Sequence, residues 1–292
     1  MLTQDAIRRI RRIAITTRKE VETGFSGAYS SVFRGRGSQF DQVRPYQEGD
    51  PIRDIDWNVT ARTGEPHIKV YTEERELTLL LVVDVSASGI FGSVRAKREL
   101  AAETAAILAF SAIYSGDKVG LLRFTDRVEQ YVPPRKGTSH VWRVIRDLLA
   151  GTATGRGTNI GLALTHLRKI RRRRAVVVLL SDFLSPLGFE RELRAVAGRH
   201  DLVAAEIVDP LDLALPNVGL IEVEDAEDRR RLWLDTSHAG VQRTYADRAA
   251  RRRKALADLC ARNGVDLLPL RTDEGAAPAL TRFFETRKRR RR

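Results

Sequence analysis

The chain has 292 residues, 42% of them hydrophobic and 30% charged, with a net charge of +13; this composition fits a soluble globular protein built as one large or two small domains. No apolar run approaches the roughly 20 residues of a membrane span, the start of the chain lacks the apolar region of a signal peptide, and the single cysteine, Cys260, excludes an internal disulfide. We therefore expect a cytoplasmic protein with no membrane span.

The N-terminal part of the chain combines patterns of helix, loop and strand. Residues 5–22 can form a helix with apolar side chains near one face, and the Gly/Ser-rich stretch 24–38 predicts a loop. Residues 41–63 mix Pro, Gly, Asp and aromatic residues, which indicates turns and irregular strands, whereas residues 67–72 alternate as a strand does. We interpret residues 1–76 as an N-terminal helix followed by a β-rich extension.

From residue 77 onward, strands and helices alternate, which predicts an α/β fold with a doubly wound, mostly parallel sheet. The predicted strands are 77–85, 118–125, 128–132, 175–181, 202–208 and 265–270. The predicted helices are 93–115 with Ser93 as its N-cap, 140–149, 159–173, 189–199, 245–262 and 279–287. We place the main domain at residues 77–275, with a hairpin insertion near 218–234, and a C-terminal helix and basic tail at 276–292.

Two apolar strands of this sheet end in carboxylates, Asp84 and Asp182, and parallel strands deliver their carboxyl ends at one edge of a sheet. Ser86 and Ser88 follow Asp84 at alternate positions, and a flexible loop between the two strands adds Thr158 if its tip reaches the same edge. Carboxylate and hydroxyl oxygens are hard ligands of the type that Mg²⁺ accepts. The set is poor in charge, which suggests a site that takes a further ligand from elsewhere.

This pattern resembles the metal-ion-dependent adhesion site of the von Willebrand factor A fold, a Rossmann-like α/β fold. The resemblance implies that Ser86, Ser88 and Thr158 contact the ion directly or nearly so, and that Asp84 and Asp182 act partly through water. It implies Mg²⁺ as the ion, with Mn²⁺ or Ca²⁺ as alternatives. An acidic residue of a partner protein would complete the site, so the ion need not stay bound without that partner.

A second group of motifs precedes the first apolar strand. It consists of Phe33-Arg34-Gly35-Arg36-Gly37, Arg44-Pro45-Tyr46-Gln47-Glu48-Gly49-Asp50, Arg53-Asp54-Ile55-Asp56-Trp57, Ala61-Arg62 and Glu73-Glu74. These motifs are similar to the signature of the DUF58 family, in which such a segment precedes a von Willebrand A-like domain. The resemblance implies an adaptor or chaperone-like partner of a MoxR-type AAA+ ATPase.

The signature segment allows two interpretations. Its dense mixture of charges and aromatic residues can form a network of ion pairs that pins an irregular segment to the sheet edge. Alternatively, it can form a partner surface, because Trp, Tyr and Arg are enriched at interface hot spots.

We predict a non-enzymatic protein–protein interaction module gated by a divalent cation, and we keep two other functions open. An Mg²⁺-dependent phosphohydrolase with an aspartyl nucleophile needs a second acid two residues after Asp84, where Ser86 stands. No Ser-His-Asp arrangement is legible among the scattered histidines. In the purely structural interpretation, Ser and Asp after a strand only cap the next helix.

The third functional candidate is nucleic-acid binding through three basic clusters, at residues 8–12, 171–174 and 287–292. No recognisable reader motif is present, and aromatic residues are not interleaved with the arginines. The cluster at 171–174 ends a predicted helix, where cations suit the helix dipole. We therefore expect nucleic acid to be an unlikely partner, while the last cluster can be either a solvated tail or a binding element.

Overall fold

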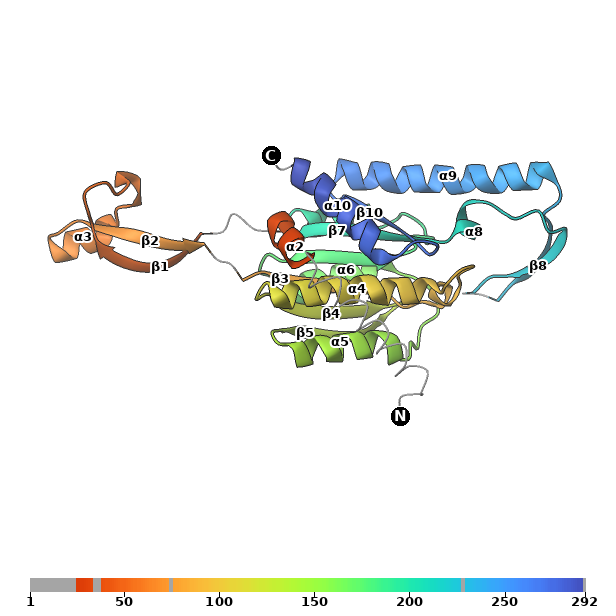
Figure 1. The fold of residues 1–292 in the computed structure, drawn as a ribbon, viewed down its shortest axis with the longest axis horizontal. Helices are drawn as coiled ribbons and strands as arrows, with labels where there is room; N and C mark the ends of the chain where they lie inside the picture. The colour runs from red at the N-terminus through yellow and green to blue at the C-terminus, as the bar shows by residue number, and fades with distance from the viewer. Residues whose placement is uncertain (1–24, 34–37, 74–75, 227–228, 291–292) are drawn as a thin grey trace. The chain divides into compact units, whose positions relative to one another are not determined.

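The structure, a computed structural model, describes residues 25–33, 38–73, 76–226 and 229–290. The described residues form two compact units: those from 38 to 77 form the smaller one, and the others form the larger one (Figure 1). The helix predicted at residues 5–22 lies outside the described residues. Within the described ranges, no helix combines the length and the apolar character that a membrane crossing requires.

The larger unit is built on a six-stranded sheet with the order β10-β7-β6-β3-β4-β5. All neighbouring strands pair in parallel except β5, which pairs antiparallel with β4. The strands are β3 (Thr78–Asp84), β4 (Lys118–Phe124), β5 (Val128–Arg135), β6 (Val176–Ser181), β7 (Asp201–Val208) and β10 (Asp266–Arg271). The prediction of an α/β fold with a mostly parallel, doubly wound sheet is confirmed.

Helices cover both faces of this sheet, because successive side chains of a strand point to opposite faces. Leu80 and Val82 of β3 belong to a core with residues of α6 (Ile160–Ile170), α7 (Glu190–Ala197) and α9 (Ala239–Arg262). The alternate residues Leu79 and Leu81 are also fully buried and point to the other face, where α4 (Lys97–Tyr114) and α5 (Thr138–Ala150) pack together. A strand buried on both faces is apolar along its length between the ends, as β3 and β6 are.

The Gly/Ser-rich stretch that predicted a loop contains a helix, α2 (Ser26–Phe33). It packs against α4 and the last helix, α10 (Ala276–Arg290). The rings of Phe33 and Phe284 lie 5.9 Å apart in an edge-to-face arrangement, and Tyr29 is fully buried. The loop prediction was wrong here because the packing of Tyr29, Phe33 and Phe284 outweighs the weak helix propensity of Gly and Ser.

The smaller unit consists of an antiparallel pair, β1 (Ser38–Pro45) and β2 (His67–Glu73), joined by a short 3-10 helix, η2 (Ile52–Asp54), and by α3 (Trp57–Thr63). We predicted only turns and irregular strands between the two strands. The helix forms because the Asp56 side chain accepts hydrogen bonds from the backbone N–H groups of Asn58 and Val59. It ends at Gly64, whose positive φ of 79° favours glycine.

The ion pairs of the signature segment that the structure describes are local to the smaller unit. Arg44 binds both carboxylate oxygens of Asp50 at 2.8 Å, and Lys69 lies 3.6 Å from Asp56. Trp57, in contrast, leaves 67% of its surface exposed. The segment therefore combines a structural network with an exposed aromatic side chain.

Beyond β7, the chain forms the short helix α8 (Pro210–Leu213) and a separate hairpin of β8 (Leu220–Glu224) and β9 (Arg231–Asp235). The hairpin agrees with the predicted insertion, and Figure 1 shows it at the same end of the larger unit as α8. One cap was wrongly predicted: α4 begins at Lys97, and Ser93 instead donates its hydroxyl to Asp209 at 2.8 Å.

Candidate metal site

The candidate site lies where the strand order changes direction. From β3 the chain adds β4 and β5 on one side, and then crosses to add β6, β7 and β10 on the other. In open α/β sheets, ligands bind outside the carboxyl ends of the strands at such a switch point. Asp84 is the last residue of β3, and Asp182 directly follows β6. Since β3 and β6 pair in parallel, with Val83 opposite Leu180, both carboxylates emerge at this edge.

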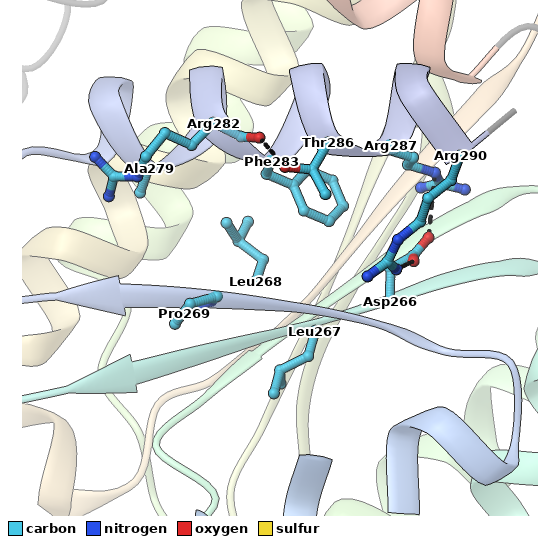
Figure 2. Close-up of a pocket in the computed structure, with 10 residues that line it drawn as sticks. All are labelled: Asp266, Leu267, Leu268, Pro269, Ala279, Arg282, Phe283, Thr286, Arg287 and Arg290. Atoms are coloured by element: carbon cyan, nitrogen blue, oxygen red, sulfur yellow. Dashed lines mark hydrogen bonds and ion pairs between the residues drawn. The ribbon is translucent and has the colours of Figure 1, made fainter. Parts of the chain in front are cut away.

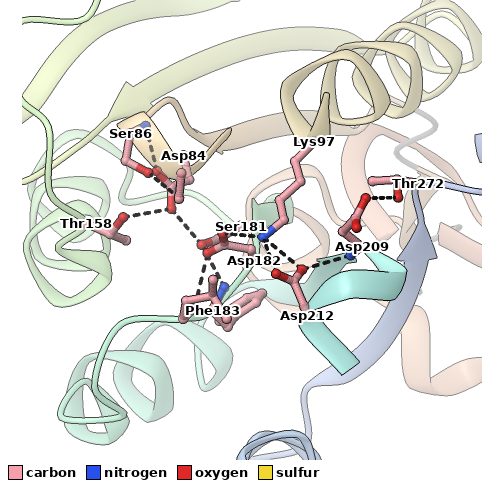
Figure 3. A network of polar contacts seen from close by, with 12 residues as sticks. Asp84, Ser86, Lys97, Thr158, Ser181, Asp182, Phe183, Asp209, Asp212 and Thr272 are labelled. Carbon is pink, nitrogen blue, oxygen red and sulfur yellow. Dashed lines mark hydrogen bonds and ion pairs between the residues drawn. The ribbon is translucent and has the colours of Figure 1, made fainter. Parts of the chain in front are cut away.

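Asp84 is at the centre of a hydrogen-bond network (Figure 3). Its Oδ1 accepts the Ser86 backbone N–H at 3.0 Å, and its Oδ2 accepts the hydroxyls of Ser181 at 2.7 Å and Thr158 at 3.3 Å. Burial raises the pKa of Asp84 to about 6, and the nearby charge of Asp182 adds to this rise, although the hydrogen bonds from Ser181 and Ser86 oppose it. A cation nearby would stabilise the ionised form of this buried carboxylate.

The two serines of the motif bring their hydroxyls together. The Oγ atoms of Ser86 and Ser88 lie 3.1 Å apart. Together with Asp84 and Asp182, they line a small pocket of about 10 Å³, which is about the room that one water molecule needs. The structure thus gathers four of the predicted ligands around one pocket and brings in the fifth, Thr158, through its contact with Asp84.

The loop that carries Thr158 is held by Glu129, a residue that the sequence did not single out. The Glu129 carboxylate accepts backbone hydrogen bonds from Thr154 and Gly155 at 3.0 and 2.7 Å. A Cβ atom on Gly155 would lie only 2.1 Å from Oγ1 of the buried Thr125, so a larger residue here would have to displace a buried neighbour. The loop also touches the motif directly, because the Ala87 N–H donates to the Arg156 carbonyl at 3.0 Å.

Asp182 is engaged on both of its oxygens. Its Oδ1 accepts the Leu184 N–H at 3.2 Å, and its Oδ2 lies 3.0 Å from the Nζ atom of Lys97. The next residue, Phe183, has a positive φ of 52°, which is strained for a residue other than glycine. Its buried ring packs against Phe189, with centroids 6.3 Å apart, and this packing holds the turn in place.

Lys97 is another residue at this site that the sequence did not single out. Its side chain is almost fully buried, and its ammonium bridges Asp182 and Asp212, the latter at 2.9 Å. Burial acts to lower the pKa of Lys97, but the two carboxylates outweigh it and hold that pKa above its ordinary value. The only sequence signal is a lysine at the first position of a helix, where the dipole favours acidic residues.

The donor set fits a small, hard divalent cation. It offers the hydroxyls of Ser86, Ser88 and Thr158 and the carboxylates of Asp84 and Asp182, all of them oxygen ligands. Over the described ranges, no group of three or more His, Cys, Asp or Glu side chains is arranged to hold a metal. A cation at this edge would therefore depend on the hydroxyls.

A larger pocket, of about 220 Å³, lies between α10 and β10 (Figure 2). Its charged residues pair with one another or with nearby strands: Arg287 contacts Asp201 and lies 3.2 Å from Asp266, and Arg290 lies 3.4 Å from Asp266. Arg287 is also buried over the ring of Phe33, at 4.7 Å. The first residue of the basic cluster at 287–292 is thus a structural anchor for α10 rather than part of a free tail.

This chain is similar to one described protein family and to a mycobacterial protein. Residues 42–255 match the family described as "Protein of unknown function DUF58". The uncharacterized protein Rv1480 of Mycobacterium tuberculosis is 35% identical over 285 residues, which cover 96% of this chain and 89% of that protein.

Solved structures that are similar include the conserved hypothetical protein BatB from Bacteroides thetaiotaomicron and the VWA domain of SpRpn10. BatB has a TM-score of 0.44 and 15% identity, covering 73% of this chain and 99% of BatB. The SpRpn10 domain has a TM-score of 0.39 and 12% identity, covering 70% of this chain and 94% of that domain.

Proposed function

Given that this chain belongs to the DUF58 family of proteins of unknown function, we propose that it is a non-enzymatic protein–protein interaction module. In this proposal, a divalent cation, with Mg²⁺ first and Mn²⁺ or Ca²⁺ as alternatives, lies among Asp84, Ser86, Ser88, Thr158 and Asp182. An acidic side chain of a partner protein completes its coordination.

The observation that carries the proposal is the convergence of side chains from three separate segments on one edge of the sheet. Asp84, Ser86, Ser88 and Asp182 line a single pocket, and Thr158 contacts Asp84. The three hydroxyls and two carboxylates are five donor groups, and Asp182 is shared with Lys97, so a bound dication keeps at least one open coordination position. A cation in such a site attracts a further anionic ligand.

The residue two positions after Asp84 favours a binding function over a catalytic one. An aspartyl nucleophile needs an acid there to protonate the leaving group. Ser86 takes that position, and its hydroxyl contacts Ser88. Both oxygens of Asp84 also accept hydrogen bonds within the chain, which suits a fixed ligand better than an attacking group.

Exposed apolar side chains around this edge supply the surface that a protein partner needs. They lie in the segment after Ser88, just after Asp182 and in the β8–β9 hairpin: Ile90, Phe91, Val94, Leu184, Val218, Leu220, Val223, Leu232 and Trp233. Trp233 leaves 66% of its surface exposed. An exposed tryptophan suits an interface hot spot.

The partner that family membership suggests is a MoxR-type AAA+ ATPase, for which this chain would act as an adaptor. A direct test is capture of that ATPase, from the same organism, by the purified full chain with Mg²⁺, with EDTA, and with EDTA followed by excess Mn²⁺. We expect binding with Mg²⁺, loss with EDTA and recovery with Mn²⁺. Asp84→Ala and Ser86→Ala should each weaken capture by at least about tenfold, since each removes a group next to the cation.

Matched controls are Ser139→Ala in the first turn of α5 and Asp258→Ala on α9, both exposed and on elements distant from β3 in sequence. They should bind as the unmodified chain does. Capture that is insensitive to EDTA and to both site substitutions would refute the cation-dependent part of the proposal, and no capture of the ATPase under any condition would refute the choice of partner.

A further inference from the structure

We infer that Lys97 is a built-in competitor of the divalent cation: its ammonium holds Asp182 while the site is free of metal, and thereby limits how tightly the site binds an ion. The inference rests on the cation site proposed above and concerns the residue that tunes it.

Without carboxylates beside it, Lys97 would be unfavourable at this position. It is the first residue of the 18-residue helix α4, at the end where the helix dipole repels a cation. Its side chain is only 3% exposed, so the ammonium has also lost most of its hydration. A lysine is kept in such a place only if carboxylates compensate it fully.

The compensation comes from two aspartates on different elements. The Nζ atom lies 3.0 Å from Asp182 Oδ2, and 3.1 and 2.9 Å from the two oxygens of Asp212 on α8. The ring of Phe91 covers the ammonium, with its centroid 5.7 Å away. The oxygen of Asp182 that does not accept the Leu184 N–H is therefore already bound to a cation.

A divalent ion that uses this oxygen has to share it with Lys97 or displace Lys97 from it. Displacement does not strand the lysine, because Asp212 remains as its partner. Asp212 is itself held in place, since its Oδ2 accepts the Asp209 N–H at 2.8 Å in a capping box at the start of α8. Lys97 can thus stay paired with Asp212 while Asp182 turns to the ion.

The local charges favour binding of a divalent ion, but only weakly. Asp84, Asp182 and Asp212 supply three carboxylates against one ammonium, so a dication still finds negative charge. Lys97 nevertheless repels that dication across a buried site, where charges are screened less than at the surface. Removal of the ammonium should therefore increase the affinity of the site for a divalent ion.

The test is the affinity of the full chain for Mn²⁺ alone, measured by calorimetry or by the paramagnetic resonance of free Mn²⁺. Lys97→Met should bind Mn²⁺ roughly tenfold or more tightly than the unmodified chain. The control is Lys254→Met, which removes an exposed lysine of α9 that does not line this pocket. Because its charge is screened by solvent, its effect should stay within about threefold.

Buried carboxylates without their lysine can prevent folding, so a second measurement uses the unmodified chain. With nitrogen-15 in its lysine side chains, the buried Lys97 ammonium should give an NMR signal that shifts when Mg²⁺ is added. Lysines on the surface, such as Lys136, should keep their positions.

The outcomes separate this inference from the proposed function. Tighter Mn²⁺ binding by Lys97→Met supports it, including the case in which only that variant binds. If the unmodified chain binds Mn²⁺ and Lys97→Met binds no more tightly, or if Lys254→Met has an equal effect, or if the Lys97 signal does not respond to Mg²⁺, the inference fails and the cation site stands. If neither protein binds Mn²⁺, both fail.

Discussion

The carboxylate of Glu129, on β5, accepts a 2.7 Å hydrogen bond from the backbone N–H of Gly155, in the loop that carries Thr158. The edge strand of the sheet thereby sets the position of a candidate ligand on a segment that has no regular structure of its own.

Replacing Glu129 by Gln should loosen this loop. Burial acts against ionisation of Glu129, but the backbone N–H groups of Gly155 and Thr154 and the hydroxyls of Thr125 and Thr154 prevail and lower its pKa to about 2. The amide would keep the shape and lose the charge-assisted bonds, which costs about 1–3 kcal/mol of the free energy of unfolding. We expect Mn²⁺ affinity to fall several-fold in calorimetry.

Glu285→Gln on α10, an exposed carboxylate, is the control and should change neither quantity. An unaltered Mn²⁺ affinity in a folded Glu129→Gln variant would show that the loop holds Thr158 without this contact.

His200 should make the folded protein less stable in mild acid. Burial, and then the positive charges of Arg171, Arg199 and Arg174, lower its pKa to about 4 from an ordinary value of 6.5. The unfolded chain therefore takes up this proton below about pH 6.5, whereas the folded protein does so only below about pH 4. Stability is lost as the pH falls through this window, by at most about 3 kcal/mol at 1.36 kcal/mol per pKa unit.

Urea unfolding at several pH values between 7.5 and 4 measures the effect. The difference between the unmodified chain and His200→Phe isolates the histidine from other groups that titrate in the same range. The variant should lose less stability on acidification, and parallel pH profiles for the two proteins would contradict this assignment.

Arg287 should be essential for docking α10, in contrast to the exposed Arg289 two residues later. Removing its charge by Arg287→Met leaves Asp201 and Asp266 without their buried partner and ends its contact with the Phe33 ring. We expect a loss of roughly 3 kcal/mol in the free energy of unfolding, measured in urea. Arg289→Met, at an exposed position of the same helix turn, should change it by no more than about 0.5 kcal/mol; equal effects would contradict the anchoring role.

Trp233 should contribute to partner binding rather than to stability. Its side chain is 66% exposed on β9, so Trp233→Ser should leave the urea midpoint nearly unchanged while it weakens capture of the proposed AAA+ partner by roughly tenfold or more. Tyr114→Ser, at the far end of α4 and 55% exposed, is the control for loss of an exposed aromatic residue. Normal capture by the Trp233 variant would place the partner elsewhere on the molecule.

The prediction of the larger unit came from local patterns that packing reinforces. A strand buried on both faces, such as β3 or β6, reads as an uninterrupted apolar run, and helices of the right length separate such runs. Because parallel strands present their carboxyl ends at one edge, the same pattern placed Asp84 and Asp182 side by side. The hairpin after β7 was visible for a similar reason, since two short alternating runs flank a turn.

Other features could not be predicted, because each depends on a partner far away in the sequence. The helix α2 exists where Gly and Ser suggest a loop, since Phe33 packs on Phe284. Ser93 reads as a helix cap but donates its hydroxyl to Asp209. Nothing in the neighbourhood of Glu129 indicates that it holds a loop some 25 residues later in the chain.

By itself, the sequence determined the sheet, its edge and the five candidate oxygen ligands, because hydrophobic period and strand direction follow from local chemistry. Only the tertiary structure decided which other side chains lie at that edge. Lys97 reaches Asp182 and Asp212 across 85 and 115 residues of chain, and no local pattern encodes a pairing of that length. Burial then turns it from one lysine among many into the charge that governs the site, because an ion pair gains its strength where water is excluded.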